Sequence, residues 1–189
     1  MTNDELLALL DGGDAPSYPE GFTSRRSFLD RQAQLDRIVN EDMPRNRAEI
    51  QHAKEFGDLS ENFEYENARR RERQLIEQQS RMAAELKAMK VYDFADAAKE
   101  ADGSVRLGST VKLGYPDGTK KTYHILGAWD FDEALGVIAC RGRLAEALCG
   151  CRAGDKAQIP HPAFDDDTLT VDVLEVKPLP KKIVDWANA

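Results

Sequence analysis

Two long helical patterns separated by a short break constrain the fold of this 189-residue chain more than any other feature. In the first pattern, apolar side chains recur at helical spacing: Leu35, Ile38, Val39, Met43, Ile50 and Ala53. The second pattern follows Gly57 and carries one stripe: Tyr65, Ala68, Leu75, Met82, Leu86 and Met89. Helices with a single apolar stripe bury it most simply by folding back on one another. The sequence therefore predicts an antiparallel coiled-coil hairpin with its tip at residues 57–62.

The first helix of this hairpin has a predicted start and a predicted irregularity. Thr23 or Ser24 can cap it, because a hydroxyl oxygen accepts a hydrogen bond from a free backbone N–H of the first turn. Pro44 lacks a backbone N–H, so we expect it to end, kink or restart the helix.

After residue 100 the helical periodicity gives way to strand-like alternation. Five segments have this pattern: "VRLGSTVKL", "KKTYHIL", "GVIACRG", "DKAQIP" and "TLTVDVLEV". A turn, "YPDG", joins the first two, and "RLAEALCG" predicts a short helix that Gly150 ends. The sequence thus predicts an α+β protein in which residues 100–180 form a small antiparallel sheet domain with one short helix.

The ends of the chain and its composition set further expectations. Residues 1–22 contain the breaker-rich "DGGDAPSYPEG", which predicts a mobile N-terminal arm, and residues 181–189 form a C-terminal tail. No apolar run approaches the roughly 18 residues of a membrane span, and the N-terminus is acidic where a signal peptide is basic. We expect a cytoplasmic monomer with no membrane partner.

The charge distribution limits how this chain could contact nucleic acid. A formal net charge of -8 argues against binding DNA or RNA through bulk electrostatics. Residues 44–90, however, hold ten basic and nine acidic side chains, so a local basic face around Arg69, Arg70, Arg71 and Arg73 remains possible. Without further information, these arginines are expected to form ion pairs along a solvated helix face.

The three cysteines, Cys140, Cys149 and Cys151, lie in one region of the chain. Their odd number favours reduced thiols over a disulfide framework. Cys149 and Cys151 could join His161 in a zinc site, but the paired two-residue spacing typical of structural zinc sites is missing. Free thiols are therefore expected.

Two acids beside the break, Asp58 and Glu61, support two interpretations. Gly57 can end the first helix, Asp58 can cap the second and Glu61 can complete a capping box. Alternatively, two carboxylates three residues apart at a helix start can share a divalent cation, since Mg²⁺ prefers carboxylate oxygens. Neither acid alone makes a closed metal site, and the residues by themselves leave both interpretations open.

The segment "GDLSENFEY", residues 57–65, resembles the tip motif GDLxENAEY of the bacterial Gre transcript-cleavage factors. "LGSTV" at residues 107–111 resembles the start of that family's C-terminal domain. The spacing of Pro44 before the tip, "VYD" at residues 91–93 and "GDKAQI" at residues 154–159 extend the resemblance over roughly residues 23–180.

The resemblance implies a coiled-coil hairpin over residues 23–99 and an FKBP-like domain over residues 100–180. In that family the C-terminal domain docks on RNA polymerase at the rim of its secondary channel, and the hairpin reaches the active centre. Asp58 and Glu61 would then help to hold a Mg²⁺ ion shared with the polymerase, which cleaves its own backtracked RNA. The resemblance implies no cofactor in the free protein and no enzymatic activity of its own.

The resemblance also assigns contacts to residues beside the acids. Asn62, Phe63, Tyr65 and Arg69 are expected at the tip, near the 3′ end of the nascent RNA in the elongation complex. Contact with the polymerase is expected from the segment of residues 141–150, and within it from Gly142, Arg143 and Leu144.

Two departures from the family pattern keep other functions open. Phe63 stands where the motif has alanine, and Gly142 with Arg143 replaces a Ser-Pro pair. A Gre-like regulator that occupies the channel and inhibits is therefore one alternative. A peptidyl-prolyl isomerase is a second, although the aromatic residues that it would need are scattered: Tyr115, Tyr123, Trp129, Phe131 and Phe164. A structural coiled-coil adaptor is the third.

Overall fold

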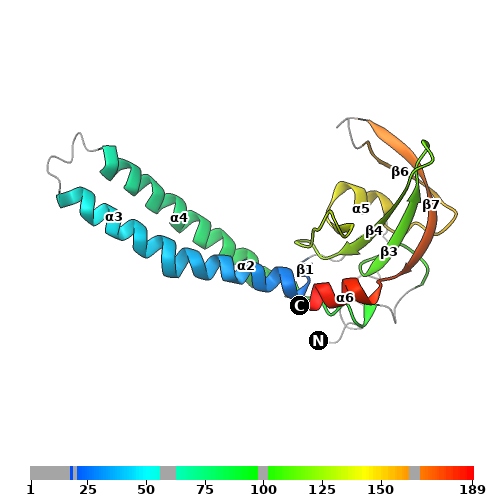
Figure 1. Ribbon diagram of the computed structural model, residues 1–189, viewed down its shortest axis with the longest axis horizontal. Coiled ribbons are helices and arrows are strands. Elements are labelled where there is room, and N and C mark those ends of the chain that lie inside the picture. The colour runs from blue at the N-terminus through cyan, green and yellow to red at the C-terminus, as the bar shows by residue number, and fades with distance from the viewer. Residues whose placement is uncertain (1–17, 19–20, 56–62, 98–101, 162–166) are drawn as a thin grey trace. The chain divides into compact units, whose positions relative to one another are not determined.

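The computed structural model describes most of the chain (Figure 1), namely residues 18, 21–55, 63–97, 102–161 and 167–189. The described chain divides into two compact units. The helical unit runs from Phe28 to Met89, and the sheet unit is built from the described residues before and after it. A helical region and a mixed sheet together confirm the predicted α+β class. None of the helices in the described ranges is both long and apolar enough to cross a membrane.

The helical unit is a hairpin of paired helices. Its first arm consists of α2 (Arg25–Arg37), the π-helical turn η2 (Ile38–Asp42) and α3 (Met43–Glu55), and its second arm is α4 (Phe63–Ala88). Figure 1 shows α3 and α4 side by side, and both α3 and η2 contact α4. The seam buries Ile38, Leu75 and Met82, with Leu35 and Met43 packed against them. The predicted hairpin is thus confirmed, but the first stripe is corrected at Val39, which is exposed and not part of the seam.

The irregularity at Pro44 takes the form of a wider helical turn. The N–H of Met43 bonds to the carbonyl of Ile38, five residues earlier, where an α-helix uses four. In a regular α-helix the ring of Pro44 would clash with the carbonyl of Asn40, and the π-helical turn lies directly before the proline. The chain therefore stays helical through Pro44, and the apolar stripe shifts by one residue between Ile38 and Met43.

One polar side chain is buried in the hairpin. Asn46, on α3, has 1% of its surface exposed, and its amide nitrogen donates a hydrogen bond to the carbonyl of Ala68 on α4 at 3.0 Å. Among the described residues, the Oδ1 atom of Asn46 has no hydrogen-bond partner. A buried asparagine in a coiled-coil seam costs stability and fixes the register of the two helices.

Replacing Asn46 with leucine tests this cost. We expect Asn46→Leu to raise the free energy of unfolding of the hairpin by about 1 kcal/mol, because it removes an unpaired buried acceptor from an apolar seam. Urea denaturation followed by far-ultraviolet circular dichroism measures the change. Asn67→Leu, at an exposed position of α4, is the control and should change stability by less than about 0.5 kcal/mol. A loss of stability in Asn46→Leu would contradict the interpretation.

The sheet unit contains a five-stranded sheet in the order β5-β4-β3-β7-β6. Its strands are β3 (Ser109–Gly114), β4 (Lys120–Leu126), β5 (Val137–Ala139), β6 (Lys156–Pro160) and β7 (Thr168–Pro178). All five predicted strands and the predicted β3–β4 hairpin are therefore present. The prediction of an entirely antiparallel sheet is wrong, because β5 pairs parallel to β4. The long connection between β4 and β5 lets the chain cross back, so that β5 runs in the same direction as β4.

Two helices accompany this sheet where one was predicted. The predicted helix is α5 (Arg143–Leu148), which lies against β6. The additional helix, α6 (Lys181–Asn188), occupies the predicted C-terminal tail and buries Ile183 and Ala187 in the core. Its Trp186 also receives the guanidinium group of Arg26 over the indole ring, 4.8 Å from the ring centroid.

The predicted mobile arm, residues 1–22, includes two residues that belong to the core instead. Tyr18 and Phe22 are 7% and 6% exposed and pack in the hydrophobic core of the sheet unit. Phe22 lies in β1 (Phe22–Thr23), which pairs in parallel with β2 (Lys90–Val91). These aromatic side chains bury apolar area that local sequence patterns do not reveal.

A buried carboxyl group holds the start of α2 to the sheet unit. Asp130, fully buried, accepts hydrogen bonds from the backbone N–H and the hydroxyl of Ser24 at 2.9 and 2.5 Å, and from the N–H of Gly127 at 2.7 Å. The hydroxyl oxygen of Ser24 in turn accepts the N–H of Ser27, which confirms Ser24 as the cap of α2. Only glycine fits at position 127, since a Cβ atom there would lie 2.3 Å from the Cα of Thr23.

Removing this carboxyl group tests how much it stabilises the sheet unit. We expect Asp130→Ala to lower the free energy of unfolding by roughly 2–4 kcal/mol, because it removes the acceptor shared by the buried donors of Ser24 and Gly127. Thermal unfolding followed by tryptophan fluorescence is selective for this unit, since Trp129 and Trp186 both lie in it. Glu133→Ala, at an exposed position of the same loop, should change little. Equal effects of the two substitutions would refute the assignment.

Candidate functional site

The acids of the tip motif lie outside the described residues. Asp58, Glu61 and Asn62 fall within residues 56–62, which join the end of α3 to the start of α4. The described part of the motif begins at Phe63, the first residue of α4. The expectations for the two acids and Asn62 therefore remain predictions.

The first turns of α4 carry the other tip residues. Phe63 is 78% exposed, an unusually open position for a phenylalanine, whereas Tyr65 is half-buried. The guanidinium of Arg69 pairs with the carboxylate of Glu72, three residues along the same helix. This pair agrees with the expected solvated face, and an exposed pair of this kind contributes little to stability. Phe63 and Arg69 are thus both available at the helix surface.

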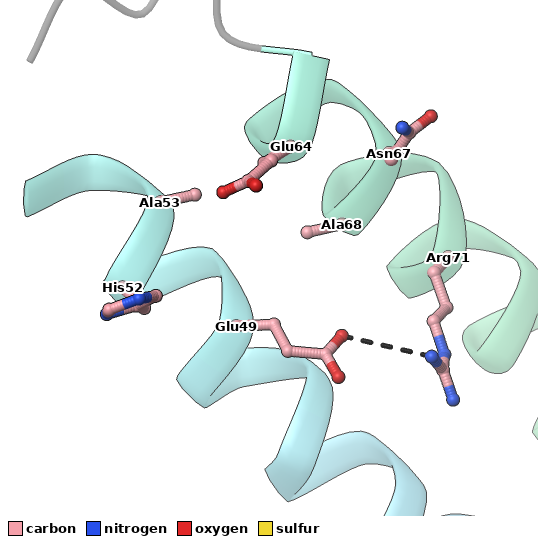
Figure 2. Close-up of a pocket in the computed structure, with 7 residues that line it drawn as sticks. All are labelled: Glu49, His52, Ala53, Glu64, Asn67, Ala68 and Arg71. Atoms are coloured by element: carbon pink, nitrogen blue, oxygen red, sulfur yellow. Dashed lines mark ion pairs between the residues drawn. The ribbon is translucent and has the colours of Figure 1, made fainter. Parts of the chain in front are cut away.

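A cleft that the sequence did not predict lies between α3 and α4, close to these residues. Its volume is about 340 Å³, and seven residues line it: Glu49, His52, Ala53, Glu64, Asn67, Ala68 and Arg71. Figure 2 shows Glu64 directed towards α3 and the ion pair that joins Arg71 to Glu49 across the helices, 3.9 Å apart. We name this space the α3–α4 cleft.

The α3–α4 cleft exists because the side chains of the seam are small there. Ala53 and Ala68, 3% and 8% exposed, occupy seam positions that larger residues fill elsewhere in the hairpin. Small side chains at both positions leave space that charged side chains from the rims then border. An alanine in each of the two predicted stripes was the only indication of this cleft in the sequence, and neither alanine alone predicts it.

The residues predicted to dock on a polymerase form the first turn of α5. Gly142 is the N-cap residue, with φ −77° and ψ 143°, and its carbonyl accepts the N–H of Glu146 at 2.9 Å. Arg143 is exposed, while Leu144 is partly buried and packs against the core. The structure brings these three residues together, and a side chain at position 142 would lie 3.1 Å from the carbonyl oxygen of Ala139.

The described residues contain no group of three or more histidines, cysteines or acids that could hold a metal ion. All three cysteines are free thiols. For Asp58 and Glu61, the donor set is two carboxylates, which suits Mg²⁺ in chemistry but leaves most of its six positions to water or another protein. The residues therefore fit a shared magnesium ion, not a closed site of this chain alone.

Among the residues that the structure describes, the aromatic side chains named for the isomerase interpretation are not gathered into one apolar cleft. The hydroxyl groups of Tyr115 and Tyr123 contact one another at 3.0 Å, and burial together with this contact raises the pKa of Tyr115 well above its usual value. Phe131 is 68% exposed. Phe164 lies outside the described residues. Such a dispersed set gives the isomerase interpretation no structural support.

Two family models match this chain. The model described as "Transcription elongation factor, N-terminal" matches residues 22–91, and "Transcription elongation factor, GreA/GreB, C-term" matches residues 100–178. The transcription elongation factor GreA of Oenococcus oeni is 32% identical over 146 residues, covering 77% of this chain and 87% of that protein. GreA of Thioalkalivibrio sulfidiphilus is 34% identical over 137 residues, covering 72% and 85%.

A solved structure is also similar. The crystal structure of GreA factor homolog 1 from Thermus thermophilus is 18% identical, with a TM-score of 0.36, and covers 83% of this chain and 98% of that one. The family models and the GreA relatives define a protein of the transcription elongation class. This chain belongs to the GreA/GreB family of transcription elongation factors.

The exposure of the tip residues predicts which substitutions leave the hairpin intact. Phe63→Ala and Arg69→Ala should each change the free energy of unfolding by less than about 0.5 kcal/mol, because neither side chain is buried in the seam. The control Leu75→Ala removes a buried seam residue and should cost about 2–4 kcal/mol. Urea denaturation followed by circular dichroism compares them. A cost above about 1 kcal/mol at either exposed position would contradict the surface assignment.

Proposed function

We propose that this protein binds a bacterial RNA polymerase through the secondary channel and stimulates the polymerase to cleave its own backtracked RNA. Membership of the GreA/GreB family supports the polymerase as partner. The observation that carries the proposal is the hairpin, whose two arms pair up to Ala53 and Ala68 and leave the motif acids in the short connection beyond. A paired hairpin can carry this connection into a narrow passage.

The proposed role of Asp58 and Glu61 is to supply carboxylate oxygens to a magnesium ion shared with the polymerase. Such an ion activates water or stabilises the leaving oxygen during phosphodiester hydrolysis. In this proposal the protein is not itself an enzyme, because two carboxylates cannot complete the coordination shell. Both acids can also favour the start of α4, since negative charge is stabilised at a helix N-terminus.

The remaining tip residues are proposed to contact the RNA 3′ end. Phe63, exposed at the start of α4, offers a ring on which a base can stack. Arg69 can release Glu72 and bind a phosphate, because an exposed ion pair is weak. Asn62 and Tyr65 complete the proposed set. The first turn of α5, with Gly142, Arg143 and Leu144, is the proposed polymerase-docking segment.

Charge-neutralising substitutions test the proposed chemistry. We expect Asp58→Asn and Glu61→Gln each to reduce RNA cleavage in a stalled, backtracked elongation complex by at least about 100-fold. Asparagine still caps a helix, so folding and polymerase binding should stay nearly unchanged. Labelled RNA resolved on a gel measures cleavage, and competition with a known channel-binding factor measures binding. Glu66→Gln, a neutralised acid in the first turn of α4, is the matched control and should cleave normally.

The other outcomes of this experiment distinguish the alternatives. Binding without cleavage, in wild type as in the variants, would identify a channel-occupying inhibitor, for which the exposed Phe63 in place of alanine is the specific observation. In that case Phe63→Ala should relieve the inhibition. Normal cleavage by both acid variants would exclude the metal role. Absence of any binding would support the coiled-coil adaptor.

A further inference from the structure

The segment after α5 is a tight turn with a cysteine on each side of a glycine. The carbonyl of Leu148 accepts the N–H of Cys151 at 3.0 Å. Cys149 has φ −57° and ψ 129°, and Gly150 has φ +77°. These angles and this hydrogen bond define a type II β-turn, in which glycine occupies the position that requires a positive φ.

The backbone of this turn is held from outside by Val105. The N–H of Gly150 donates to the carbonyl of Val105, and the N–H of Val105 donates to the carbonyl of Cys151, both at 2.8 Å. Val105 is itself 1% exposed, so it forms a fixed support. These two hydrogen bonds therefore hold the backbone of the turn that carries both cysteines.

The separation of the two cysteines suits a disulfide bond. Two residues with one residue between them have Cα atoms at most about 7.2 Å apart when the chain is extended, and a turn shortens this distance. Disulfides join Cα atoms that lie about 4.4–6.8 Å apart.

The three cysteines differ in access and in their contacts. Cys140 is fully buried, whereas Cys149 and Cys151 are partly exposed. The hydroxyl of Tyr18 donates to the carbonyl of Ala145 at 2.9 Å and is also hydrogen-bonded to the Cys149 thiol. Since the one hydroxyl proton points to Ala145, the thiol is the donor in the second bond. Cys151 lacks this contact and is the thiol better placed to react first.

We propose that Cys149 and Cys151 form a reversible redox pair, which closes to a disulfide while Cys140 remains a thiol. The oxidant is a low-molecular-weight disulfide, RSSR. The Cys151 thiolate attacks one sulfur, forms Cys151–S–S–R and expels RS⁻. The Cys149 thiolate then attacks the Cys151 sulfur, forms the Cys149–Cys151 bond and expels the second RS⁻. The two thiol protons end on the two expelled thiolates, so the protein loses two electrons and RSSR becomes two RSH.

The surroundings slow the oxidation of this pair. Burial raises the pKa of Cys149 and Cys151, and raises that of Cys140 to about 11. Protonated thiols exchange slowly, so the pair should close only when oxidised thiol accumulates. Closure adds a covalent link at the C-terminal end of α5 and removes the proton that Cys149 donates to Tyr18. This inference does not depend on the proposed function.

Differential alkylation of the full-length protein tests the pair. The protein is equilibrated with mixtures of reduced and oxidised glutathione, quenched with acid, alkylated and digested with trypsin. Cleavage after Lys121, Arg141, Arg143 and Arg152 places Cys140 in one peptide and the other two cysteines together in another. We expect the peptide of residues 144–152 to lose about 2 Da and escape alkylation, reversibly with dithiothreitol. At the same glutathione ratio, Cys140 should be at least about tenfold less oxidised.

Three variants sharpen the result. Cys151→Ser should abolish the mass loss, Cys140→Ala should preserve it, and Gly150→Ala should reduce the closed fraction several-fold, because alanine disfavours a positive φ. Tryptophan fluorescence checks that each variant is folded. An open pair in wild type under the most oxidising mixture would overturn the proposal. A disulfide that includes Cys140, or one that joins two chains, would overturn it as well.

Discussion

The sheet unit and the first turn of α2 share one buried carboxyl group, on which the rest of the fold depends. Asp130 accepts the N–H and hydroxyl of Ser24 together with the N–H of Gly127. Buried donors without an acceptor are costly, so this carboxyl group allows the chain to begin a helix in a place that water does not reach. Close approach of the two backbones also requires glycine at position 127. A single acid thereby holds Ser24, the residue that caps α2.

Some residues of the hairpin seam stabilise the pairing of its helices, and others fix the register of that pairing. Ile38, Leu75 and Met82 supply apolar burial, while Asn46 places an amide in the same seam at some cost. The π-helical turn before Pro44 lets the helix continue and moves the stripe by one residue. Towards the connection, alanines replace the larger residues and open the α3–α4 cleft. The hairpin therefore buries its larger apolar side chains in its middle and has its larger cleft near the connection between α3 and α4.

Much of the fold could be predicted because its signals are local. Helical stripes, five alternating segments and a Pro-Gly turn identify the hairpin, the strands β3 to β7 and the helix α5. The parallel pairing of β5 could not be predicted, since strand direction depends on the path of a loop and not on side-chain alternation. For the candidate site, the tip motif identified Phe63, Tyr65 and Arg69, but their exposure and ion pairing required the three-dimensional structure.

The sequence by itself determined the family, the two-part architecture and the residues that carry the proposed chemistry, because each depends on short motifs or periodic burial. Only the tertiary structure decided which distant residues meet. Tyr18 joins the core and hydrogen-bonds to α5, and Ser24 meets Asp130 across 106 positions of the chain. The turn at Gly150 is likewise fixed by Val105. The hydrophobic periodicity of a segment does not indicate which distant segment it will contact. These contacts are therefore decided by the packing of the whole chain.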